Sequence, residues 1–95
     1  MTNLNYQYEG LETITDFIRW GGSIFTKAEL FFGHGTDNAF DESKVLVFYA
    51  LHLPANVPEN YWLSRLTTQE KQAVTELFRR RIESRKPAAY LTGEA

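Results

Sequence analysis

The chain has 95 residues, 43% hydrophobic and 15% aromatic, with a formal net charge of −2 at pH 7. This length accommodates one domain with a modest core, and the composition excludes an intrinsically disordered chain. The absence of cysteine excludes disulfides and thiol chemistry, and the mildly acidic balance gives no general attraction to nucleic acid or anionic membranes.

The sequence of the N-terminal third predicts a flexible terminal segment followed by a long helix. Residues 1–9 are mostly polar and show no secretory signal, so we expect a flexible arm. From residue 10 to about residue 32, apolar residues recur at the i, i+3, i+4, i+7 spacing of an amphipathic helix. Gly21 lies on the apolar side of this pattern, which predicts either close approach of a second helix or a kink. Gly33 is expected to end the helix in a left-handed conformation.

A second helix is predicted over residues 41–53, which contain no Gly or Pro. Asp37 or Asp41 is the expected N-cap, and Asp41 and Glu42 suit the first turn. The apolar run at residues 45–51 would also fit a buried strand, but length and capping favour a helix. That run is far too short to cross a bilayer, so we expect a soluble cytoplasmic protein. Because the segment is apolar on most sides, we expect it in the centre of a bundle.

The remaining sequence predicts a short helical turn at residues 61–63 and a third long helix. Thr67 and Glu70 have the spacing of a capping box, which marks the start of this helix. Pro87 disfavours helical geometry in the residue before it, so the helix is expected to end near there. The predicted fold is therefore all-α, a small bundle of three main helices plus a short helical turn.

Motifs for catalysis or metal binding are missing from this sequence. It lacks the glycine-rich phosphate-binding and nucleophile motifs, and its two histidines, His34 and His52, have no metal-ligand spacing. We therefore predict no catalytic, cofactor-binding or metal-binding residue. The glycine-rich turn around His34 and Asp37 could bind an anion or a peptide. The simpler interpretation is the end of one helix followed by the start of the next.

Basic residues gather near the C-terminus, where five of the ten fall between Arg79 and Lys86. They could form a phosphate-binding stripe. Glu83 interrupts the stripe, and Glu76 offers Arg80 a partner one turn away. A solvated helical surface is the default interpretation, and an RNA or protein contact is the alternative.

Three segments resemble a known family. Residues 79–95, Arg-Arg-Arg-Ile-Glu-Ser-Arg-Lys-Pro-Ala-Ala-Tyr-Leu-Thr-Gly-Glu-Ala, resemble the connection between the N-terminal helical domain and the catalytic domain of HemK/PrmB glutamine N5-methyltransferases. Residues 33–42, Gly-His-Gly-Thr-Asp-Asn-Ala-Phe-Asp-Glu, and residues 50–54, Ala-Leu-His-Leu-Pro, are similar to one branch of that family. This branch methylates a large-subunit ribosomal protein, the third of the L series.

The resemblance implies a division of labour. Residues 10–86 would form a helical substrate-recognition domain, and residues 87–95 would begin a linker to a catalytic methyltransferase domain absent from this chain. The family's cofactor loop and Asn-Pro-Pro-Tyr motif lie beyond the equivalent of Ala95. S-adenosylmethionine is therefore implied for the parent enzyme only, and no catalytic residue is carried over to this chain.

The resemblance also implies partners. The expected partners are the ribosomal protein substrate and the catalytic domain, and a direct nucleic-acid contact stays open. We expect His34, Thr36 and Asp37 to contact the substrate. The residues expected to face the catalytic domain or ribosomal RNA are Arg79, Arg80, Arg81 and Arg85. Two alternatives remain: a stand-alone helical interaction module, and a small RNA-binding domain that uses the basic helix, which the acidic balance disfavours.

Overall fold

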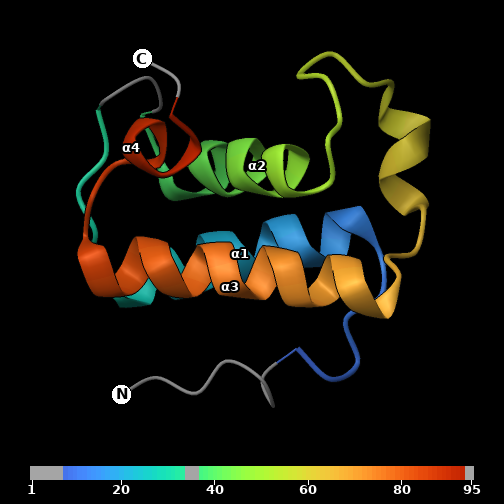
Figure 1. Cartoon of the computed structure of the whole chain (residues 1–95), viewed down its shortest axis with the longest axis horizontal. Coiled ribbons are helices and arrows are strands. Elements are labelled where there is room, and N and C mark those ends of the chain that lie inside the picture. Colours follow the sequence, from blue (N-terminus) through green and yellow to red (C-terminus); the bar gives the residue numbers. More distant parts are fainter. Residues whose placement is uncertain (1–7, 34–36, 94–95) are drawn as a thin grey trace.

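The computed structural model describes residues 8–33 and 37–93. The elements, in chain order, are α1 (Ile14–Lys27), α2 (Ala39–Ala50), the 3₁₀ helix η2 (Glu59–Leu63), α3 (Thr68–Ser84) and α4 (Ala88–Thr92). Figure 1 shows α2 and α3 antiparallel to each other, with α1 behind them and the short α4 at one end of α2. No strand occurs within the described ranges, so the all-α prediction is confirmed and the strand alternative for residues 45–51 is wrong.

Helix α1 begins later than predicted because a local capping box fixes its start. Thr13 is the N-cap, and its hydroxyl accepts a hydrogen bond from the backbone N–H of Asp16 at 3.1 Å. The Asp16 carboxylate in turn accepts from the N–H of Thr13 at 3.0 Å. These two bonds satisfy N–H groups that a helix start otherwise leaves unpaired. The predicted start at residue 10 is therefore wrong.

Helix α1 also ends earlier than predicted, at Lys27 rather than near residue 32. Glu29 adopts left-handed geometry, with φ of 55°. The backbone N–H groups of Glu29 and Leu30 then donate to the carbonyls of Thr26 and Phe25, at 3.0 and 3.3 Å. These two hydrogen bonds close the last turn of the helix. Gly33, at φ of 130°, lies beyond the helix and does not end it.

Helix α2 has a side-chain cap that differs from both predicted caps. Asn38 is the N-cap, and its side-chain oxygen accepts from the N–H of Asp41 at 2.9 Å. Asp37 and Asp41 are therefore wrong as caps, although Asp41 and Glu42 do occupy the first turn. At the other end His52 is left-handed, with φ of 59°, and closes the helix as Glu29 closes α1.

Gly21 lies where three helices meet. A methyl group on its Cα would collide with Ser43 of α2 and lie 2.5 Å from Cζ of Phe78 on α3. Both neighbours are fully buried, so neither can move aside without disturbing the core. The predicted close approach of another helix is confirmed. Around this point lie the fully buried apolar side chains of the core: Phe17, Phe25, Leu46, Val47, Val74 and Phe78.

The C-terminal part of the chain contains two helices, of which α3 was predicted and α4 was not. Helix α3 begins after the N-cap Thr67 with the predicted capping box, because Thr67 and Glu70 exchange side-chain to backbone hydrogen bonds of 3.1 and 2.8 Å. It ends at Ser84, and Arg85 follows in left-handed geometry. The chain then forms α4, with Ala88 buried, where the sequence predicted a linker. The division into domains stays a prediction.

The predicted short turn is also present, as η2. Trp62 packs edge-on against Phe48 of α2, with ring centroids 5.8 Å apart, while Tyr61 and Leu63 remain exposed. Within the described ranges, no helix combines the length and apolarity needed to span a bilayer.

Candidate functional site

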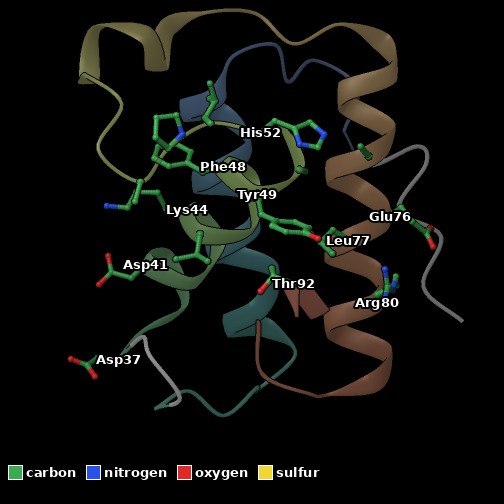
Figure 2. Close-up of a pocket in the computed structure, with 16 residues that line it drawn as sticks. Asp37, Asp41, Lys44, Phe48, Tyr49, His52, Glu76, Leu77, Arg80 and Thr92 are labelled. Atoms are coloured by element: carbon green, nitrogen blue, oxygen red, sulfur yellow. The ribbon is translucent and has the colours of Figure 1, made fainter. Parts of the chain in front are cut away.

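An open groove of about 1120 Å³ lies between α2 and α3 (Figure 2). Phe48 and Leu77 contribute its most buried apolar side chains, with 4% and 6% of their surface exposed. Val45 and Tyr49, one turn apart on α2, are 41% and 43% exposed. Figure 2 shows the Tyr49 ring extending from α2 toward Leu77 of α3, and Thr92 of α4 at one end of the groove.

The groove exists because α2 is apolar on more sides than the bundle covers. As predicted for a central helix, α2 contacts α1, α3 and α4. Leu46 and Val47 are fully buried, whereas Val45 and Tyr49 remain partly exposed. Partly exposed apolar side chains gathered along a groove are a common feature of binding surfaces. The prediction missed these groove residues, although the nearly all-apolar helix was a signal for them.

Charged side chains border the groove on both sides. Asp37 and Asp41 lie at the N-terminal end of α2, on its outer side in Figure 2. Glu76 and Arg80 lie on the α3 side. Arg79 pairs with Glu76, and this hydrogen bond lowers the pKa of the Glu76 carboxyl, so Glu76 carries charge at neutral pH. The side chain of Arg80 forms no hydrogen bond or ion pair with another residue in the described ranges.

Of the three predicted substrate-contact residues, Asp37 lines this groove. His34 and Thr36 lie outside the described residues.

The four predicted contact arginines have four different environments. Arg79 is paired with both Glu76 and Glu83, which raises the pKa of its guanidinium. Glu76 forms its ion pair with Arg79 rather than with Arg80, whose charge only adds to the lowering of the Glu76 pKa, and Arg80 lines the groove. Arg85 donates to the backbone carbonyls of residues 28 and 29, at 3.2 and 2.9 Å. Arg85 thus helps to cap the C-terminus of α1.

The prediction that Arg81 contacts a partner is wrong, because Arg81 has no exposed surface. Its Nε donates to Oε2 of Glu42 at 3.0 Å, and its Nη2 donates to the carbonyl of Phe31 at 2.8 Å. Glu42, only 2% exposed, uses Oε1 to accept from the backbone N–H of Ala88 at 2.9 Å. This buried ion pair connects α2, α3, the start of α4 and the segment after α1. A partner cannot reach Arg81 there.

Two other features bear on possible binding. Within residues 8–33 and 37–93, no three His, Cys, Asp or Glu side chains come together as metal ligands would. A second, smaller hollow of about 530 Å³ lies between the end of α3 and α4, with Arg80, Lys86 and Tyr90 among its lining residues. Glu83 also lines it, so its charge is mixed.

Comparison with known proteins identifies close relatives of the chain. No protein-family model matches it, and no solved structure matches it. The chain is 53% identical over 85 residues to the ribosomal protein uL3 glutamine methyltransferase of Xanthomonas campestris pv. campestris, a match covering 90% of the chain and 28% of that relative. Proteins of the same name from two strains of Xylella fastidiosa are 52% identical over 85 residues, which is 90% of the chain and 27% of each.

The chain thus spans less than a third of the length of the curated relatives that it matches. The identity extends over most of the chain, well beyond the three segments that suggested the family. The predicted resemblance is therefore confirmed: over this part of their length, the chain is a homologue of the ribosomal protein uL3 glutamine methyltransferases.

Proposed function

We propose that this chain is the substrate-recognition part of a methyltransferase that modifies a glutamine of ribosomal protein uL3. The observation that carries the proposal is the 53% identity over 90% of the chain to a protein of that name. Such a role would place the protein in the cytoplasm, with the ribosomal proteins.

Methylation of a glutamine side chain depends strongly on positioning. The amide nitrogen is a weak nucleophile because its lone pair is delocalised into the carbonyl group. The reacting atoms must therefore be held close together and in line, and such positioning can supply several kcal/mol of the barrier reduction. A helical region that binds the protein substrate would provide this positioning.

The proposed methyl donor is S-adenosylmethionine, which would supply an electrophilic methyl group on a sulfonium. Its adenine, ribose and amino-acid groups require an enclosed pocket with several hydrogen-bonding groups. The groove between α2 and α3 does not fit this requirement, because it is open and includes the exposed side chains of Val45 and Tyr49. We therefore propose that the cofactor is bound by a region that corresponds to the unmatched part of the longer relatives.

Among the predicted contact residues, Asp37 and Arg80 keep the best support because both line the groove. His34 and Thr36 remain predictions. The basic helix offers less to RNA than its sequence suggests, since Arg81 is buried and Arg79 is paired with two carboxylates.

Calorimetry on the 95-residue chain tests the proposal. Purified uL3 is expected to bind, and S-adenosylmethionine is expected not to bind at micromolar concentrations. Failure of uL3 to bind would favour a stand-alone module with another partner, and micromolar cofactor binding would refute the division of labour.

A second test uses turnover. In a full-length protein that contains this chain, Asp37→Ala is expected to slow methylation of uL3 and leave cofactor affinity unchanged. The exposed Glu59, outside the groove, provides the matched control as Glu59→Ala.

A further inference from the structure

We propose that the groove between α2 and α3 binds a segment of uL3 that combines an apolar side chain with a nearby Lys or Arg. The apolar side chain would pack between Tyr49 and Leu77, and the cation would face Asp37 and Asp41. This inference rests on the proposed function, and it specifies which surface contacts the substrate and the chemistry of the segment that it recognises.

The apolar part of the proposal follows from the exposure of α2. Val45 and Tyr49 stand one turn apart with 41% and 43% of their surfaces exposed, above the buried Phe48 and Leu77. Covering them with an apolar side chain would remove this surface from water. Tyrosine is also frequent at the energetic centre of interfaces, because it adds a large contact area with little loss of side-chain entropy.

The charge of the groove specifies the second feature of the segment. Lys44 lies 5.7 Å from the ring of Trp62, and Glu76 pairs with Arg79. The carboxylate of Asp41 accepts a hydrogen bond from Nδ2 of Asn38 at 3.0 Å, but this neutral partner does not compensate its charge. Asp37 and Asp41 then present exposed carboxylates beside α2.

Arg80 lines the groove on the α3 side, and its side chain forms no hydrogen bond or ion pair among the described residues, although it interacts electrostatically with Glu76. A segment with a cation toward α2 and a carbonyl or carboxylate toward Arg80 would match both sides.

A ribosomal protein suits this pattern for a physical reason. Proteins that bind RNA neutralise its phosphates with Lys and Arg side chains, so an RNA-bound protein has many basic segments to offer. RNA itself would bring phosphates toward Asp37 and Asp41, which disfavours it as the occupant of this groove.

The decisive experiment compares two tyrosines of similar exposure. Tyr49 lies in the groove and is 43% exposed, whereas Tyr61 lies on η2, outside the groove, and is 53% exposed. Purified uL3 is titrated into the 95-residue chain carrying Tyr49→Ser or Tyr61→Ser. We expect Tyr49→Ser to weaken binding about tenfold, as truncation of a central interface tyrosine does, and Tyr61→Ser to change it less than about twofold. Circular dichroism melts verify that both variants are folded.

The cationic feature is tested separately by charge reversal. Asp37→Lys is expected to weaken uL3 binding and to reduce its dependence on salt, because it removes an attraction that salt screens. The exposed Glu59→Lys is the control for the same change in net charge, and it is expected to have a smaller effect. Overlapping peptides of uL3 then locate the segment. The expected binding peptides contain both a basic and a large apolar residue, and they lose affinity for the Tyr49→Ser chain.

The outcomes separate this inference from the proposed function. If uL3 binds the unaltered chain but Tyr49→Ser and Tyr61→Ser behave alike, the groove is not the contact surface and the proposed function stands. If uL3 does not bind the unaltered chain, the proposed function fails and the inference fails with it. If sedimentation shows dimers that Tyr49→Ser abolishes, a second copy occupies the groove and the inference is overturned.

Discussion

The buried ion pair between Arg81 and Glu42 should dominate the response of this domain to mutation. Arg81→Met keeps most of the side-chain volume but removes the only cation that contacts Glu42 within the described ranges. Glu42 is 2% exposed, so its carboxylate would stay buried without a counter-charge. Leaving one charge of such a pair unpaired costs about 3–5 kcal/mol. Domains of this size have about 5–15 kcal/mol of total stability, so we expect a loss of at least a fifth of it.

Urea denaturation followed by circular dichroism at pH 7 measures this effect. The matched control is Arg79→Met, two positions earlier on α3, where the arginine is partly exposed and its partners Glu76 and Glu83 can be solvated. We expect a much smaller loss for that variant, because water replaces an exposed ion pair at little cost.

A double variant, Arg81→Met with Glu42→Leu, removes both charges. It is expected to be more stable than Arg81→Met alone, since no unpaired charge remains. Equal urea midpoints for Arg81→Met and Arg79→Met would refute the reasoning.

Three further variants test other parts of the fold. Gly21→Ala is expected to destabilise the protein by about 1–3 kcal/mol, because its methyl group collides with buried side chains of α2 and α3. The atoms nearest to a methyl group on Gly22 all belong to the ring of the half-exposed Phe40, so we expect a smaller effect of Gly22→Ala, and the two urea midpoints can be compared directly. The backbone N–H of Thr13 donates to Asp16 and lowers the pKa of its carboxyl below the ordinary 3.8. The ionised Asp16 carboxylate thus contributes to the stability of the folded state above pH 3.8, and this contribution is lost as pH falls through the folded-state pKa. Asp16→Asn should therefore reduce the loss of stability between pH 5 and pH 2, and unchanged acid melts would contradict this.

Local signals in the sequence predicted part of the fold. The capping box at Thr67 depends on two residues three positions apart, and the place of Gly21 on the apolar side of a helical pattern predicted a close helix contact; both are present in the structure. The helix ends were harder to predict, because Glu29, His52 and Arg85 take left-handed geometry that usually favours glycine. The types of these three residues therefore do not indicate where the helices end.

The candidate site was less predictable than the fold. Whether Val45 and Tyr49 are buried or exposed depends on which sides of α2 the other helices cover, and periodicity does not contain that information. The burial of Arg81 was equally hidden. Its partner Glu42 lies 39 positions away, and the neighbouring arginines on α3 have the same residue type but different surroundings.

The contacts of Arg81 and Glu42 also bear on the order of folding. The three hydrogen bonds of this cluster join residues 39, 46 and 50 positions apart. Contacts at such separations require much of the chain to be organised first, because each closes a long loop at an entropic cost. We therefore expect the cluster to form after the rate-limiting step, so that its loss would speed unfolding far more than it slows refolding. In the cell, this cluster would then set the lifetime of the folded domain more than the speed at which it forms.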